Sequence, residues 1–150
     1  MKRSLTVGLI AGSVAIAGGT AWAETVNAGY VLITDGAEFT GSTTFMPREF
    51  SQGCMQFDGD LVDTADDGRS VYVHGKVMGY GWAGRTEIYD GQGSTSPASA
   101  CLYDPAATQV QYGWVAVCVN RNNLPDRCTE QRFERPGNSL PPVSVDDILP

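Results

Sequence analysis

The chain has few of the residues on which enzymes and nucleic-acid-binding proteins usually rely. It contains one histidine, His74, and no nucleophile motif such as G-x-S-x-G. Ten lysines and arginines stand against 17 aspartates and glutamates, which gives a formal net charge of -7. Binding of nucleic acid needs a concentrated basic surface, so we exclude this class of partner. We expect His74 to be an exposed strand residue, and the protein to act by binding, without catalysis or a cofactor.

After the first 23 residues the chain also lacks any apolar run long enough to span a membrane. Residues 1–23 have the pattern of a secretory signal peptide, with two basic residues, an uncharged apolar run, and Ala21 and Ala23 as an A-x-A cleavage site. We expect cleavage before Glu24 and secretion to an extracellular or periplasmic location, without membrane insertion. Because two of the 10 basic residues and none of the acidic ones lie in this leader, the remaining chain would carry a formal charge of -9.

Closely spaced cysteine pairs are absent, which argues against a zinc site or a C-x-x-C redox motif. An even number of cysteines in an exported chain instead favours two disulfides. Three connectivities are open, and we predict Cys54 with Cys101 and Cys118 with Cys128. The second bridge would close a short loop of turn-forming residues between two strands. The chain-entropy estimate for the shorter and the longer loop is about 3 and about 4 kcal/mol of stability.

No stretch after the leader has the apolar spacing of an amphipathic helix beyond a turn or two. Residues 71–90 and 109–120 mix β-branched and aromatic residues with glycine, which predicts central strands, the first of them bent or divided. Their glycines also permit close approach of another backbone. We therefore predict one all-β domain over residues 24–135, a small antiparallel β-sandwich, with a compact β-barrel as the alternative. Further strands are expected at residues 25–34, 38–45, 54–62 and 127–133.

Composition leads to several local expectations. Serine and threonine in residues 38–45 favour an exposed edge strand. The acidic turn at residues 63–69 ends in Asp-Gly and an arginine, which predicts a hairpin into the following strand. Residues 91–100 hold almost no apolar side chains and are expected to form a loop. Apolar residues on both faces of residues 110–119 predict cover on both sides. The proline-rich residues 136–150 are expected to form an extended tail.

Aromatic residues gather in the two central stretches. Because large aromatics are usually buried, core filling is the favoured interpretation. If Tyr80, Trp82 and Tyr89 are exposed instead, they would suit a protein hot spot or stacking on sugar rings. We accordingly predict a protein- or ligand-binding module for an extracytoplasmic protein or glycan, with a carbohydrate-binding module as one alternative. The aromatic residues concerned are Tyr72, Tyr80, Trp82, Tyr89, Tyr112 and Trp114.

The loop between Cys118 and Cys128 supports a second alternative. It carries Arg121 and Arg127, and a stapled loop of this kind resembles in principle the binding loops of small secreted protease inhibitors, in which rigidity lowers the ordering cost of binding. Either arginine could enter a trypsin-like pocket.

The acidic residues 58–67 superficially resemble a calcium loop. The stretch holds five aspartates, but Val62 stands where the third ligand of the EF-hand pattern belongs. A solvated acidic turn is therefore favoured, and we predict no metal site.

Overall fold

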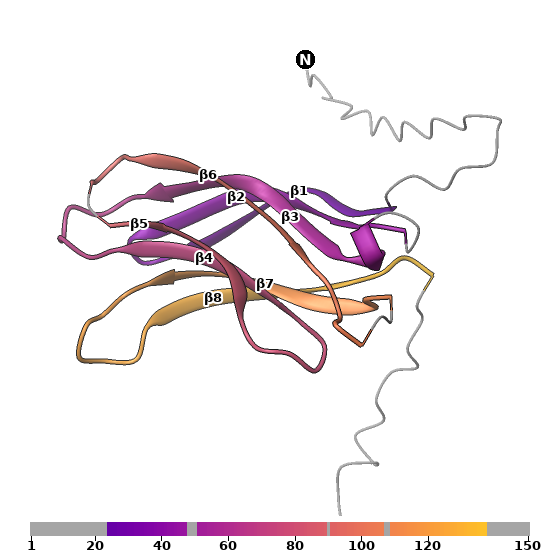
Figure 1. Cartoon of the computed structure of the whole chain (residues 1–150). Coiled ribbons are helices and arrows are strands. Elements are labelled where there is room, and N and C mark those ends of the chain that lie inside the picture. Colours follow the sequence, from indigo (N-terminus) through magenta and orange to yellow (C-terminus); the bar gives the residue numbers. More distant parts are fainter. Residues whose placement is uncertain (1–23, 48–50, 90, 107–108, 138–150) are drawn as a thin grey trace, which may run out of the picture.

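The computed structural model describes residues 24–47, 51–89, 91–106 and 109–137. Two four-stranded antiparallel sheets pack face to face (Figure 1), with strand orders β1-β2-β3-β6 and β5-β4-β7-β8. The predicted all-β sandwich is confirmed, and the sheets do not close into a barrel. The elements are β1 (Glu24–Thr34), β2 (Ala37–Phe45), η1 (Ser51–Gly53), β3 (Met55–Asp63), β4 (Val71–Val77), β5 (Ala83–Ile88), β6 (Thr95–Leu102), β7 (Tyr112–Val119) and β8 (Arg127–Glu134).

The predicted leader, residues 1–23, lies outside the described residues, as does the predicted tail from residue 138 onward. In the part of the chain that is described, no helix is long and apolar enough to cross a membrane.

Two of the local expectations in the first sheet are wrong. Strand β2 is not an edge strand, because it pairs with β1 on one side and with β3 on the other. Its polar content is tolerated because the hydroxyl oxygens of buried Thr43 and of Tyr30 lie 2.9 Å apart and share a hydrogen bond. Residues 91–100 are not wholly a loop, since β6 begins at Thr95 and pairs with β3. Its inward residues before Leu102 are small, so the strand carries little apolar signal.

The expected hairpin at residues 63–69 is also wrong, because β3 and β4 belong to different sheets. The turn carries the chain from one sheet to the other. Asp63 fixes its start, since the Asp63 carboxylate accepts from the Ala65 amide at 3.2 Å and the Asp63 carbonyl accepts from the Gly93 amide at 2.6 Å. The same Asp-Gly ending would serve a hairpin, which is why the sequence pattern did not separate the two cases.

The core between the sheets consists of phenylalanine, methionine and aliphatic side chains. Of the aromatic residues expected to fill it, only Tyr72 is buried, in a separate cluster on the outer face. Valines of β4 and β7 face the first sheet and belong to this core. The outward residues of β7 are covered by neighbouring side chains and not by a further layer of the fold. Tyr72 packs there on Ala116 and Cys118. A phenolic hydroxyl or an indole N–H needs a polar partner, which explains why the tyrosines and tryptophans lie outside the core between the sheets. The largest fully buried side chains are Phe39, Phe45, Phe57 and Phe133.

Both predicted disulfides are confirmed. Cys54 and Cys101 join the start of β3 to the end of β6, and Cys118 and Cys128 are directly opposite each other on β7 and β8. Each bridge therefore braces one sheet. Two disulfides fit an extracellular or otherwise oxidising compartment.

A buried arginine joins three segments at one end of the sandwich. Arg135, directly after β8, is 6% exposed. Its Nε donates to the Val110 carbonyl at 2.8 Å, and its Nη2 donates to the carbonyls of Met46 and Gly53 at 3.0 and 3.1 Å. These bonds hold together the chain after β2, the η1 turn and the chain before β7.

Replacement of Arg135 by methionine should therefore destabilise the fold strongly. We expect a loss of about 3 kcal/mol in the free energy of unfolding measured with urea, because three charge-assisted hydrogen bonds disappear from buried carbonyls. The matched control is Arg132→Met, which removes an exposed ion pair with Glu134 and should lose about 1 kcal/mol or less. Equal losses for the two variants would contradict a structural role specific to Arg135.

Candidate functional site

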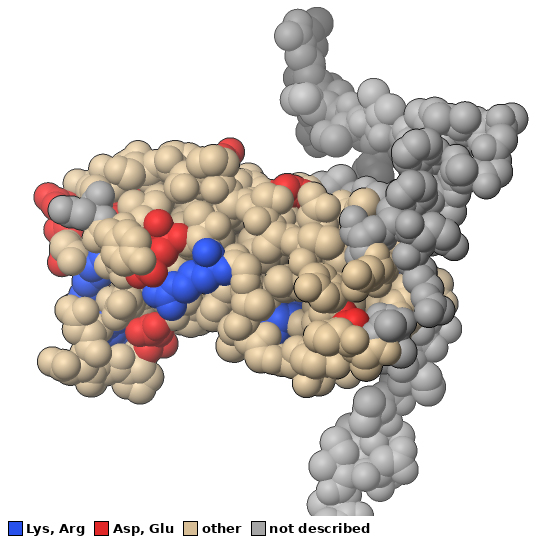
Figure 2. All heavy atoms as spheres, in the orientation of Figure 1, with Lys and Arg blue, Asp and Glu red and all other residues tan. Residues whose placement is uncertain are grey.

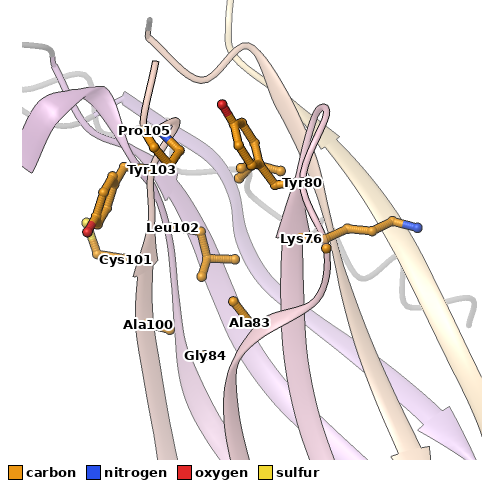
Figure 3. Close-up of a pocket in the computed structure, with 11 residues that line it drawn as sticks. Lys76, Tyr80, Ala83, Gly84, Ala100, Cys101, Leu102, Tyr103 and Pro105 are labelled. Atoms are coloured by element: carbon orange, nitrogen blue, oxygen red, sulfur yellow. The ribbon is translucent and has the colours of Figure 1, made fainter. Parts of the chain in front are cut away.

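An apolar cleft opens where the turn between β4 and β5 meets the end of β6 (Figure 3). Its volume is about 420 Å³, within the usual range for small-molecule sites. Tyr80 and Tyr103 stand on opposite sides of the cleft, with Leu102 between them, as Figure 3 shows. The lining residues are Lys76, Val77, Tyr80, Gly81, Ala83, Gly84, Ala100, Cys101, Leu102, Tyr103 and Pro105.

Two glycines allow the cleft floor to pack tightly. A β-carbon at Gly75 would lie 2.5 Å from Leu102 Cδ1, and one at Gly84 would lie 2.5 Å from the Ala100 β-carbon. Gly84 also has a φ of +65°, which side-chain-bearing residues rarely adopt. The floor therefore depends on backbone positions that only glycine fills without displacement.

Hydrogen bonds fix the Tyr80 side of the cleft. The Tyr80 hydroxyl donates to Asp104 Oδ1 at 2.6 Å, and the Ala106 amide donates to the same oxygen at 2.8 Å. The bond to Asp104 raises the pKa of Tyr80. Since Asp104 follows β6 and Tyr80 follows β4, this bond connects the two sides of the cleft. The rings of Tyr80 and Tyr103 remain 42% and 51% exposed.

The outer face of the second sheet carries a layer of aromatic and cationic side chains beside the cleft. We call it the outer-face layer: Tyr72, His74, Lys76, Trp82, Trp114 and Arg132. The ring of Trp82 stacks on His74 with centroids 4.2 Å apart and an angle of 8° between the planes. Lys76 Nζ lies 4.4 Å from the ring centroid of Trp82 and 4.8 Å from that of Trp114. Tyr72, His74 and Lys76 lie at alternate positions of β4, which places their side chains on the same face of the sheet.

His74 is half-buried in this layer, so the expectation of an exposed histidine is wrong. Burial beneath its neighbours, together with the nearby Arg85 guanidinium, lowers the pKa of His74 to about 4. His74 Nε2 lies 3.8 Å from Cys118 Sγ, but that sulfur belongs to a disulfide. The pair therefore offers no thiol nucleophile.

The three aromatic residues that were predicted to bind lie in three different places. Tyr80 lines the cleft and Trp82, 39% exposed, lies in the outer-face layer beside it. Tyr89 is 76% exposed and does not line the cleft. Sequence reasoning missed Leu102, Tyr103 and Lys76. The sequence offered one signal for Leu102 and Tyr103: they directly follow Cys101, for which a disulfide was predicted.

Arg121 and Arg127 lie at the other end of β4 from the cleft, because the β7–β8 loop adjoins the pair Val71 and Val119. Arg127 Nη1 is 2.6 Å from Asp35 Oδ2. The Arg121 carbonyl accepts from the Leu124 amide at 3.3 Å, which closes a turn. The inhibitor role of this loop stays a prediction.

Asp126 connects the same loop to the outer-face layer. Its carboxylate accepts from the Tyr72 hydroxyl. Burial, together with this hydrogen bond, raises the pKa of Tyr72 to about 12. The base of the loop is thereby tied to β4.

The acidic residues 58–67 are spread over β3 and the crossing turn. The Gln56 amide donates to Asp58 at 2.6 Å, Asp63 is buried, and Asp67 accepts from the Arg69 amide. Within the described ranges, no three histidine, cysteine, aspartate or glutamate residues lie close enough together to hold a metal ion.

Comparisons with family models, curated proteins and solved structures find no match for this chain. We therefore infer the function from the geometry of the cleft and of the outer-face layer.

The covering of His74 by Trp82 can be tested by NMR titration of the chain's only histidine. We expect a midpoint at a pH of about 4 in the folded protein, and near 6.5 in urea, the ordinary value. Since the unfolded state takes up the proton first, stability should fall as the pH is lowered from about 6.5 to about 4.

Trp82→Ala should raise the midpoint by exposing the imidazole to water, whereas Tyr89→Ala, which removes an exposed ring, should leave it unchanged. A folded-state midpoint above about 6 would show that His74 is not covered as described.

Proposed function

We propose that the protein is a non-catalytic, extracytoplasmic binding module whose cleft accepts an apolar or aromatic group of its ligand. The observation that supports this proposal is the placement of two half-exposed tyrosine rings across an apolar floor. Amphipathic rings that stay accessible to solvent contribute large contact areas to binding sites. Removal of apolar surface from water contributes about 25 cal/mol per Å².

The polarity of the cleft favours an apolar group over a sugar. Its floor is formed by Leu102, Ala83 and Ala100, and the Tyr80 hydroxyl is already bonded to Asp104. A sugar ring brings several hydroxyl groups that each need a partner when buried. The carbohydrate alternative is supported by Trp82, whose ring is partly exposed next to the cleft.

The proposed location outside the cytoplasm is supported by the two disulfides and by the leader pattern of residues 1–23. The proposal assigns no catalytic role, and this part is supported by His74, which is covered by Trp82 and lies next to a sulfur already in a disulfide. A general base needs access to the proton that it removes.

A fluorescence titration with the neutral apolar dye N-phenylnaphthylamine tests the proposal. We expect saturable binding to the mature protein and a Kd about tenfold higher for Tyr103→Ala, which removes one wall of the cleft. The matched control is Tyr89→Ala, which deletes an exposed tyrosine outside the cleft and should change the Kd less than about twofold.

Unchanged binding by Tyr103→Ala would show that the dye does not use the cleft. If the dye does not bind while a glycan from a broad panel shifts the fluorescence of Trp82, the carbohydrate alternative replaces the proposal.

A further inference from the structure

Most arginines of the described residues are paired with a carboxylate, and Figure 2 shows basic and acidic side chains next to one another on one face of the molecule. Four arginines lie 2.6 to 3.8 Å from a carboxylate. Arg135 is buried and donates to three backbone carbonyls. Within the described ranges, neither Lys76 nor Arg121 forms an ion pair, and Arg121 lies at the far end of β4. Lys76 is therefore the cation that remains unneutralised at the cleft.

The two tryptophans position this ammonium without using its full hydrogen-bonding capacity. Lys76 Nζ lies within 5 Å of the ring centroids of both Trp82 and Trp114. An ammonium has three N–H donors, and ring faces attract its charge without supplying oxygen acceptors. Because these contacts already fix the Lys76 side chain, binding of an anion would cost little additional side-chain entropy.

The position of Lys76 defines the shape of a ligand that reaches both features. Lys76 lines the cleft, but Figure 3 shows its side chain running away from Leu102, so that the nitrogen points out of the cleft. A group seated on the floor cannot itself contact the ammonium. A ligand that uses both must place an apolar body in the cleft and an acidic group outside it.

We propose that Lys76 makes the cleft selective for a small amphipathic anion, with a carboxylate, sulfonate or phosphate at the ammonium and an apolar body between Tyr80 and Tyr103. This inference rests on the proposed function of the cleft. The ligand is a free small molecule and not a lipid surface, because an anionic membrane would repel a chain with a formal charge of -7.

Two related dyes test the role of the charge. Anilinonaphthalene sulfonate carries a sulfonate that N-phenylnaphthylamine lacks, and both are titrated into the mature protein. Lys76→Met keeps an apolar side chain but removes the ammonium, so the Kd of the sulfonate dye should rise about tenfold, while that of the neutral dye should change less than about twofold.

Two further variants serve as controls. Lys76→Arg should retain most of the sulfonate-dye affinity, because the charge is kept. Arg69→Met removes an exposed cation that pairs with Asp67, and Arg69 belongs neither to the outer-face layer nor to the cleft lining. It should leave both affinities within about twofold.

The outcomes separate this inference from the proposed function. If the neutral dye binds through Tyr103 but Lys76→Met affects the two dyes equally, the anion role is overturned and the apolar cleft stands. If neither dye binds saturably, the cleft function itself fails.

Two measurements on the unaltered protein complete the test. Octanesulfonate should displace the neutral dye at a lower concentration than octanol does, because it has the same apolar chain and adds a charge that Lys76 can bind. Equal or weaker displacement by octanesulfonate would overturn the anion role even if Lys76→Met does not fold. Co-sedimentation of the protein with phosphatidylglycerol vesicles would overturn the assignment to a free small molecule.

Discussion

Leu102 packs into space that two glycines of the opposite sheet leave open, and the cleft depends on this contact. Leu102 ends β6, whereas Gly75 and Gly84 lie on β4 and β5. A side chain at either glycine would push Leu102 or Ala100 away and separate the sheets at this edge. Because the disulfide of the adjacent Cys101 fixes the end of β6, the floor is formed before any ligand arrives. Such pre-organisation lowers the ordering cost of binding.

Much of the fold could be predicted from the sequence because the long strands have clear signals. The alternating valines of β4 and the dense apolar run of β7 predicted central strands, and the two strands are indeed paired. The edge strand β6 was missed because small inward residues such as Ala98 and Ala100 carry little apolar signal. The division of strands between the sheets was also out of reach, since the turn at residues 63–69 has the same composition whether it reverses the chain or crosses between sheets.

Only half of the cleft could be predicted, for a physical reason. Tyr80 could be predicted as a candidate binding residue because it is an aromatic residue in a glycine-rich segment. Tyr103 and Leu102 come from the other sheet, and the packing of one sheet edge against another leaves no periodic pattern in the sequence. The same applies to Lys76, since alternation predicts only that it faces outward. Its position between two tryptophans depends on the register of β4 with β7 and on the path of the turn that carries Trp82.

The acidic balance of the chain gives the isolated Lys76 a selective role. A formal charge of -7 repels anions at long range, but salt screens this repulsion over roughly 10 Å. The attraction of Lys76 acts only at contact. A simple anion therefore gains little from approaching the protein, whereas an anion with an apolar body also gains the burial of that body between Tyr80 and Tyr103. Discrimination arises because neither contribution suffices alone, and the repulsive field disfavours ligands that offer charge without apolar surface.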